Sequence, residues 1–241
     1  MLPIRQSNTM AQVPDIKDKM ILFGNVNLVP DHYDDWQAAY DKLAEHVFAN
    51  EPNTYTYYFG LPLEHADNPS RSDFMLAFEV YGCRDDLYEV HLKSEAMTQG
   101  FLPTALPVMT TGLDLVHFGV AGGFLDFSGR KDECGIMHDV QIRCADANAR
   151  RELLGALRML CQAVELAQKR DGKGEVLTFL GLENLDNEVG ARIFARYKDR
   201  ETLEAWQRSD VFKGFWEVVK AGVQDMSARA YRPNGKGWLW K

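Results

Sequence analysis

The chain of 241 residues is acidic, with a formal net charge of −8, and 46% of its residues are hydrophobic. This charge balance, without a basic run, argues against electrostatic binding to nucleic acid or to an anionic membrane. No stretch approaches the roughly 20 apolar residues that a membrane-spanning helix needs. The partner that this composition favours is a small neutral or aromatic molecule.

The N-terminus and the cysteines indicate the compartment. Residues 1–18 carry a single Arg and lack the apolar segment of a secretory signal, and we expect them to form a flexible or draped tail. The four cysteines are spaced neither as a zinc pair nor as a dense disulfide framework. We therefore expect reduced thiols in a cytoplasmic protein.

The first half of the chain predicts the order strand, helix, strand, strand, helix, strand. Apolar, aromatic and β-branched runs predict its strands at residues 20–29, 54–61, 74–81 and 111–118. Asp31 is a favourable cap for the first helix, whose apolar positions recur at helical spacing from Trp36 to Val47. A second helical pattern runs from residue 85 to about 106 and is interrupted by a Gly and a Pro.

The second half repeats this order with its own helix caps. Strands are predicted at residues 134–144, 176–182, 189–197 and 226–232. Asp146 and Asp199 are typical caps for the two helices between these strands. The first of these helices carries Leu153, Leu157 and Val164 on one face, which predicts that this face is buried.

The two halves also match residue for residue, at a period of about 115. FEVY from Phe78 aligns with FARY from Phe194, and GFLDF from Gly123 aligns with GWLWK from Gly237. Ordered matches of this kind, together with the shared order of elements, indicate an internal repeat rather than chance similarity.

The domain organisation follows from this repeat. The polar segment 128–133 separates two units, at residues 19–128 and 134–241, each with the βαββαβ order of a ferredoxin-like fold. Such a unit carries both helices on one face of its sheet, so the other face must be buried. The predicted class is α+β, with the two sheets packed together as a pseudo-dimer within one chain, which leaves a further homo-oligomer open. The aromatic segments 124–127 and 238–240 are expected to reach across to the opposite half.

Two aligned segments, FEVYGCRDDLYEVHLKSEAM and FARYKDRETLEAWQRSDVF, resemble the third strand and the following helix of the antibiotic-biosynthesis-monooxygenase family of dimeric α+β barrels. The resemblance covers nearly the whole chain, once in each half, and implies an intramolecular α+β barrel. That superfamily includes cofactor-free oxygenases, heme-degrading enzymes, cyclases, isomerases and proteins without known activity. The resemblance therefore implies a fold more sharply than an activity.

The heme-degrading branch of that superfamily has a pattern that can be compared with this sequence. Asn25 matches its Asn on the first strand. Tyr81 and Tyr197 stand where that branch has a Trp at the end of the third strand, and Phe215 and Trp216 stand where its heme-ligating His falls. The sequence therefore argues against heme degradation.

Motifs for a metal or a tightly bound nucleotide are missing from the sequence. The His residues form no HxxxH or HExxH spacing, and neither GxGxxG nor GxxxxGK occurs. Cofactor-free oxygenases of the family that the chain resembles act on phenolic, anthrone-like substrates, and they need a base, a donor for an oxyanion and an aromatic wall. The prediction is a cofactor-independent monooxygenase for a small aromatic, polyketide-like (anthrone- or quinol-type) substrate, with molecular oxygen as co-substrate.

The residue types that this chemistry needs gather in the first half. His91 is the preferred base, because it lies four residues after Leu87 and therefore on the inward face of its helix. Asn25 and Tyr81 are the other catalytic candidates. The predicted substrate-binding residues are aromatic or amide side chains on the neighbouring strands: Phe23, Asn27, Tyr57 and Phe78.

In the second half, the sequence predicts a filled pocket, because Trp206 aligns with His91. His138 and Asp139 are adjacent on a strand, so they point to opposite faces and are not expected to touch. Arg192 and Arg196 are interpreted as solvated charges on a strand.

Two alternative functions stay open at this point. One is a non-oxidative cyclase, isomerase or decarboxylase that uses the same base and pocket. The other is a non-catalytic small-molecule-binding or stress-response barrel, in which aromatic side chains close both pockets. An open cavity lined by His91 and Asn25 would favour an enzyme, and a solid core would favour the non-catalytic alternative.

Overall fold

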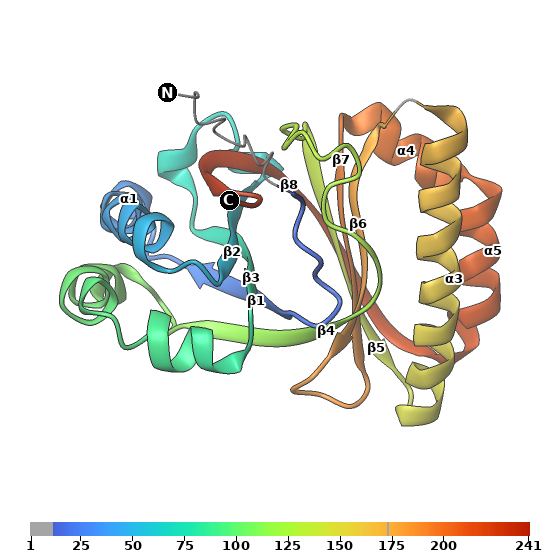
Figure 1. Cartoon of the computed structure of the whole chain (residues 1–241), viewed down its shortest axis with the longest axis horizontal. Helices are drawn as coiled ribbons and strands as arrows, with labels where there is room; N and C mark the ends of the chain where they lie inside the picture. Colours follow the sequence, from blue (N-terminus) through green and yellow to red (C-terminus); the bar gives the residue numbers. More distant parts are fainter. Residues whose placement is uncertain (1–11, 173) are drawn as a thin grey trace, which may run out of the picture.

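The computed structural model describes residues 12–172 and 174–241, which form an α+β barrel with a helix layer on either side (Figure 1). The first half contains β1 (Met20–Asn27), α1 (Tyr33–Asn50), β2 (Thr54–Pro62), β3 (Phe74–Tyr81), α2 (Leu102–Ala105) and β4 (Asp114–Phe124). The second half contains β5 (Ile136–Cys144), α3 (Ala147–Asp171), β6 (Val176–Asn184), β7 (Gly190–Tyr197), α4 (Arg200–Arg208), α5 (Asp210–Val219) and β8 (Val223–Trp238).

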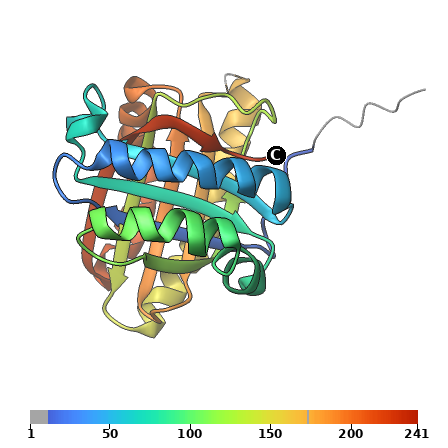
Figure 2. The same ribbon diagram turned by 90° about the vertical axis from the view of Figure 1, so that its left-hand side faces the viewer.

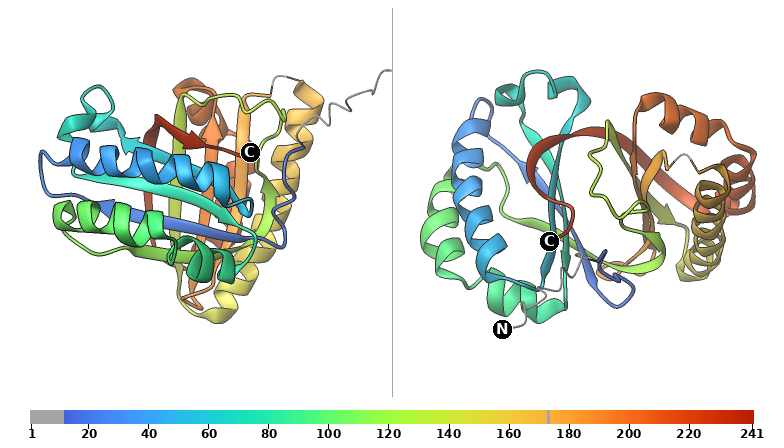
Figure 3. Two further views of the ribbon diagram at one scale, coloured as in Figure 1. Left: turned by 60° about the vertical axis from the view of Figure 1, so that its left-hand side comes forward. Right: turned by 45° about the horizontal axis from the view of Figure 1, so that its top comes forward.

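All eight strands form one closed antiparallel sheet in the order β1-β3-β2-β8-β5-β7-β6-β4. β4 pairs with β1 of its own half and with β6 of the other half, and β8 likewise pairs with β5 and with β2. Figure 3 shows β8, in dark red, arching from one side of the barrel to the other. The two predicted sheets therefore face each other, but they are joined at both edges into a single barrel.

The predicted aromatic segments make these crossings. Phe124 pairs with Phe179 of β6, and Trp238 pairs with Tyr57 of β2. A glycine precedes each crossing residue, and both glycines have positive φ, 117° at Gly123 and 76° at Gly237. A Cβ atom would lie 1.9 Å from a β6 carbonyl oxygen at the first position and 1.8 Å from a β2 carbonyl oxygen at the second. Only glycine fits where the two strands approach so closely.

The core has three layers. The barrel interior is filled by aromatic and aliphatic side chains from both halves, in which the rings of Phe78 and Phe194 lie 4.4 Å apart. A second cluster lies between the first-half strands and α1, and a third lies between the second-half strands and the helices α3 and α5. Because successive strand residues point to opposite faces, each strand contributes alternately to the interior and to a helix layer.

The helix starts and strand ends correct several sequence expectations. Asp31 does not cap α1: its φ is 66°, and the helix begins after His32 without a side-chain cap. Asp146 and Asp199 do cap α3 and α4, each accepting a backbone N–H at 2.8 Å. The fourth strand of each half is longer than predicted, since it has to pair with both halves.

The expectation that Arg192 and Arg196 are solvated was wrong. Both face the barrel interior and are only 3% and 1% exposed. Arg192 forms a two-pronged ion pair with Asp139, and Arg196 donates to the backbone carbonyl of Asp132 at 2.7 Å. Burial of the two cations is tolerated because each guanidinium finds oxygen acceptors.

The predicted tail lies partly outside the described residues, since residues 1–11 are not among them. Within the described part, Ile16 is 4% exposed and packs into the barrel cluster. Over residues 12–172 and 174–241, the helices are too short or too polar to cross a membrane.

Candidate functional site

A cavity of about 50 Å³ lies between the outer face of the first-half strands and the helix layer that covers them. Figure 2 shows this layer, with α1 and the helical segments of residues 86–105 lying across the strands. The residues that line the cavity are Leu22, Gly24, Asn25, Val26, Trp36, Tyr40, Tyr57, Phe59, Ala77, Glu79, Leu87, His91, Leu92, Met97, Phe101, Met109, Leu113, Asp114 and Leu115. Most are apolar or aromatic, so the few polar groups among them stand out.

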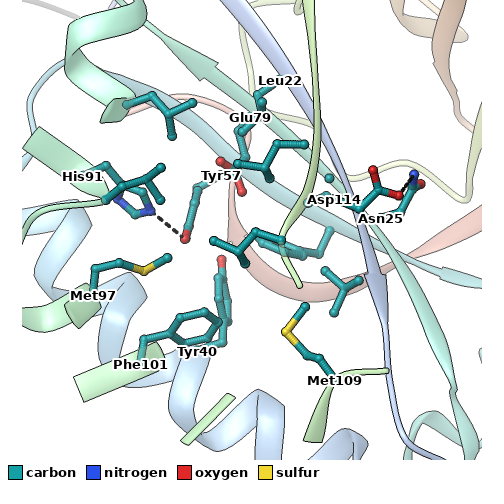
Figure 4. A pocket seen from close by; sticks show the side chains of 18 of the residues that line it. Leu22, Asn25, Tyr40, Tyr57, Glu79, His91, Met97, Phe101, Met109 and Asp114 are labelled. Atoms are coloured by element: carbon teal, nitrogen blue, oxygen red, sulfur yellow. Dashed lines mark hydrogen bonds between the residues drawn. The ribbon is translucent and has the colours of Figure 1, made fainter. Parts of the chain in front are cut away.

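His91 is held by a buried carboxylate. Its Nδ1 lies 2.9 Å and 3.2 Å from the two carboxylate oxygens of Glu51, and both side chains are 3% exposed. The carboxylate can only accept, so Nδ1 carries the hydrogen and the lone pair of the neutral ring lies on Nε2. Figure 4 shows this nitrogen directed toward Tyr57. Glu51 thus sets the tautomer and the orientation of the imidazole.

The charge on Glu51 is stabilised by several neighbours. Burial raises its pKa, but the hydrogen bond and the charge of His91 and the hydroxyl of Thr54, at 3.0 Å, outweigh burial, and the pKa is lowered overall. Glu51 lies at the end of α1, where Lys241 from the C-terminus donates to its backbone carbonyl at 2.6 Å. Glu51 therefore stays ionised beside the imidazole.

Tyr57 links the imidazole to the aromatic wall. Its hydroxyl lies 3.4 Å from Nε2 of His91, and its ring stacks on Tyr40 with centroids 5.3 Å apart. Burial raises the pKa of Tyr57 well above its usual value, and the carboxylate of Glu79 adds to that shift. Tyr57 is therefore a neutral hydrogen-bond donor in this site, rather than a phenolate.

Glu79 is a functional candidate that the sequence analysis missed. It is 7% exposed, it lines the cavity, and it accepts a hydrogen bond from Tyr81 at 2.7 Å. Burial raises its pKa to about 7, although the charge of His91 and the bond from Tyr81 oppose that shift. A carboxyl group with this pKa exchanges protons near neutral pH. The available signal was an acidic residue within the otherwise apolar strand FMLAFEVY.

Two donors of the cavity wall have no partner among the described residues. These are the indole N–H of Trp36 and the hydroxyl of Tyr40, which are buried on adjacent turns of α1 with their rings stacked 5.4 Å apart. Burying a donor without an acceptor costs about 1–3 kcal/mol. Their position in the lining suits a ligand that brings an acceptor oxygen.

The other predicted site residues do not all gather here. Asn25 touches the cavity, but its amide donates to Asp114 at 2.8 Å, on the far side of β1 from His91 (Figure 4). Asn27 donates to Thr111 at 3.1 Å, beyond the cavity lining. Tyr81 lies behind Glu79, which it hydrogen-bonds, and its ring centroid is 5.7 Å from that of His91.

Phe23 and Phe78 face the other side of the sheet. Both belong to the cluster inside the barrel, with ring centroids 5.2 Å apart. Period-two alternation places them opposite to Leu22 and Glu79, which line the cavity. Among the predicted site residues, the structure therefore brings together His91 and Tyr57, with Tyr81 behind them and Asn25 at the edge.

The backbone beside His91 has an unusual conformation. Asp86–His91 and Ala96–Phe101 are π-helical, where an α-helix was predicted, and the N–H of Leu92 bonds to the carbonyl of Leu87 five residues earlier. Such wide turns are rare and occur often at functional sites. Here they place His91, Met97 and Phe101 on the cavity side.

A second histidine and carboxylate pair joins the two halves. The ring Nδ1 and the backbone N of His117, in β4, each lie 2.8 Å from the carboxylate of Asp186, which follows β6. Its Nε2 lies 2.9 Å from the hydroxyl of Tyr88, in the first π-helical segment. This chain of contacts connects the second half to the wall of the first-half cavity.

The second half has apolar side chains at the equivalent positions. Phe179 pairs with Ala195 just as Tyr57 pairs with Glu79. Trp206, aligned with His91, is partly buried at the edge of the apolar cluster under α3. His138 and Asp139 point to opposite faces, and the carboxylate of Asp139 binds Arg192 instead.

In residues 12–172 and 174–241, no group of three or more His, Cys, Asp or Glu side chains converges as a metal site would require.

Comparison with known proteins supports the fold. No family model matches this chain, and no curated protein matches it. The solved structures of two putative monooxygenases cover almost the whole chain. That of Fusobacterium nucleatum has a TM-score of 0.70 and 10% identity over 93% of this chain and 95% of its own. That of Lactobacillus acidophilus has a TM-score of 0.67 and 10% identity over 90% and 94%.

A third solved structure, of an anthrone oxidase-like protein, has a TM-score of 0.60 and 13% identity over 94% of this chain and 97% of its own. At these identities the likeness concerns the fold alone. It shows that the barrel of this chain has the architecture of these proteins along nearly its full length.

Proposed function

We propose that this protein is a cofactor-independent monooxygenase that acts on a small aromatic, anthrone- or quinol-type molecule in the first-half cavity. The observation that carries the proposal is the pair formed by His91 and the buried Glu51, inside an aromatic wall with two unpartnered donors. The likeness to an anthrone oxidase-like protein and to two putative monooxygenases is consistent with this activity.

His91 is the proposed base. Glu51 holds the imidazole with its Nε2 lone pair toward the cavity, and it stabilises the imidazolium that forms when a proton is taken up. Tyr57 donates to the same nitrogen at rest and is the group that a substrate hydroxyl would replace. Glu79, with a pKa of about 7, is a second proton acceptor on the cavity wall.

The donors of Trp36 and Tyr40 have the proposed role of stabilising the substrate oxyanion. Deprotonation of an anthrone or quinol produces an electron-rich enolate or phenolate, whose charge rests on oxygen. Two hydrogen-bond donors already fixed in an apolar wall stabilise that charge without reorganisation. The substrate oxyanion would supply the acceptor that both donors lack among the described residues.

The proposed reaction needs no other redox group, because the deprotonated substrate is itself the reductant. It transfers one electron to dioxygen, and the two radicals combine to a peroxide at carbon. Loss of water from this peroxide leaves a carbonyl group, so that one CH₂ group and one O₂ become one C=O group and one H₂O. The protein has to remove a proton, stabilise the anion and exclude bulk water.

The resting cavity is smaller than such a substrate. About 50 Å³ accommodates dioxygen or a few water molecules, whereas sites for drug-sized ligands have about 300 Å³ or more. Entry therefore requires side chains to move. Met97 and Met109 line the cavity, and methionine side chains adapt readily. Leu113, which is 37% exposed, and Asp114 lie at the edge where β4 begins.

The division of the chain into two ferredoxin-like units, 19–128 and 134–241, is part of this proposal. Each half supplies four strands in the same order and one helix layer. Only the first unit carries the reactive groups, so the second unit completes the barrel as a pseudo-dimer partner.

The experiment is an oxygen-electrode assay with anthrones and quinols, with product identification by absorbance and mass. Oxygen uptake matched by quinone formation, in protein passed over a chelating resin, is the expected result. Turnover without oxygen uptake would replace the proposal by the non-oxidative cyclase, isomerase or decarboxylase, and the absence of both binding and turnover would favour the non-catalytic barrel.

A further inference from the structure

The outer face of the second helix layer carries an apolar groove. α3 and α5 lie side by side at the edge of the molecule (Figure 1), and the hollow between them has a volume of about 290 Å³. The groove is lined by Ala156, Met159, Leu160, Ala163, Val211, Gly214, Phe215 and Val218. Val218 and Met159, 76% and 72% exposed, are the most exposed large hydrophobic side chains of the described residues.

The groove combines a hollow with protruding side chains. Small residues, Ala163 on α3 and Gly214 on α5, line the hollow, and no atom lies within 4 Å of the place where a Cβ of Gly214 would stand. Met159 and Val218 stand beside it as protruding side chains. A two-fold axis through the groove would place the protruding residues of one copy in the hollow of the other.

The charges around the groove do not oppose such contact. Three acidic side chains of α3 and α5 pair with nearby lysines: Glu165 with Lys169, Asp210 with Lys213 and Glu217 with Lys220. The whole chain carries a formal charge of −8, so two copies repel each other in most orientations. Paired charges on this face repel a second copy less than unpaired acidic residues would.

The available area suits a standard interface. α3 has 25 residues and α5 has 10, which gives lengths of about 37 Å and 15 Å at 1.5 Å per residue. Neighbouring helices lie about 8–10 Å apart. The face formed by α3, α5 and the adjoining α4 therefore measures roughly 600–700 Å² in projection. Stable interfaces bury about 800 Å² of accessible surface per partner, which is of the same order as this face.

We propose that the α3 and α5 face is the interface of a symmetric homodimer of this chain, with Met159 and Val218 of each copy packed into the groove of the other. The proposal is independent of the chemistry in the first-half cavity, which lies on the opposite side of the barrel (Figure 1). Dimerisation leaves that cavity unobstructed and covers the apolar surface that is otherwise exposed to water.

Sedimentation velocity and light scattering on the full chain test this proposal. The wild-type protein should be a dimer at micromolar concentration, and Met159→Asp combined with Val218→Asp should raise the dimer Kd at least about 100-fold, because each interface would then bury four carboxylates. Val90→Asp, at an exposed apolar position in the other half, is the control and should remain dimeric. Circular dichroism shows that each variant is folded.

A second measurement locates the contact. Met159→Cys combined with Ala163→Cys, in a Cys83→Ser background that removes the exposed native thiol, should cross-link position 159 of one copy to position 163 of the other on mild oxidation. A monomeric wild-type protein up to high concentration would overturn the proposal, as would a dimer that both Asp substitutions leave intact. Binding of a different protein to this face without self-association would also overturn it.

Discussion

The two helix layers of the barrel cover strands of the same topology but enclose different contents. Under α1 the paired strand positions hold Tyr57 and Glu79, whereas under α3 the equivalent positions hold Phe179 and Ala195. The first layer contains π-helical turns, a cavity and unpartnered donors, and the second contains capped α-helices over an apolar cluster. The polar groups under α1 include donors without a partner among the described residues, whereas the side chains that α3 covers are largely apolar.

The comparison also separates the outer faces of the two layers. The layer with the proposed active site is covered by α1, whose exposed side carries one large hydrophobic residue, Phe48. The apolar layer instead presents the groove of Met159 and Val218. If both proposals hold, catalysis and association occupy opposite sides of one barrel and can be disrupted separately.

The largest expected effect is the loss of turnover when the proposed base is replaced. His91→Gln keeps a donor for Glu51 but no basic nitrogen, so turnover should fall about 10²- to 10⁴-fold while the protein stays folded. His91→Ala is a less clean test, because it leaves a buried carboxylate unpaired at a cost of about 3–5 kcal/mol. Steady-state oxygen uptake measures the effect, and a fully active His91→Gln protein would move the site elsewhere.

The next effect concerns Glu79 and pH. Its folded-state pKa of about 7 lies above the value of about 4.5 expected when it is unfolded. The protonated carboxyl therefore contributes stability that is fully present below about pH 4.5 and is lost as the pH rises through 7. Glu79→Gln, which cannot ionise, should be more stable than wild type at pH 8, by roughly 2–3 kcal/mol, with little difference at pH 5.

Melting temperatures of the two proteins at pH 5 and pH 8 measure this effect. Glu45→Gln, at an exposed position of α1, is the control and should show no such divergence. Equal shifts of Glu79→Gln at the two pH values would mean that the carboxyl does not titrate in this range. Activity provides a second readout, because the rise of wild-type kcat/KM through pH 7 should flatten in the variant if Glu79 accepts a proton.

A smaller effect is expected at Trp206, the counterpart of His91. Its indole is only partly buried against the apolar cluster, so Trp206→Ala should cost about 1–2 kcal/mol, less than the 3–5 kcal/mol of a fully buried ring. Turnover at a temperature where the variant is folded should match wild type. Loss of activity without loss of stability in urea unfolding would show that the second half takes part in the chemistry.

The smallest effect is expected for the contact between the halves at Asp186. Burial opposes ionisation of this carboxyl, but the backbone N–H and the ring of His117 outweigh it and lower its pKa. The contact therefore stabilises the fold above the unfolded pKa of about 4, and that contribution is lost as the pH falls. Because Asp186 is 43% exposed, solvent reduces the effect of Asp186→Asn to about 0.5–1 kcal/mol at pH 7.

Urea midpoints of wild type and Asp186→Asn at pH 7 and at pH 4 measure this difference, which should shrink at the lower pH. The variant should also bind an anthrone less tightly if Tyr88 transmits the contact to the cavity wall. A difference that is constant with pH would assign the effect to packing rather than to charge.

Local sequence signals were enough to predict the repeated order of strands and helices and the caps at Asp146 and Asp199, and they placed a glycine before each aromatic segment at the strand crossings. These features depend on signals within a few residues: periodic apolar positions, a cap acceptor, or a backbone angle that only glycine adopts. The two halves could be compared from the sequence alone, because the same local signals occur in both.

Which side chains meet depends on long-range packing that the sequence signals do not contain. Glu51 reaches His91 from the end of α1, 40 residues earlier, and Glu79 joins them from β3. The spacing of residues in a strand shows which side chains share a face, but it does not show whether that face points into the barrel or toward the helices. The sequence therefore could not reveal that Phe23 and Phe78 face the barrel interior instead of the cavity. That choice follows from closure of the barrel, in which long-range pairing of β4 and β8 assigns one face of every strand to the interior.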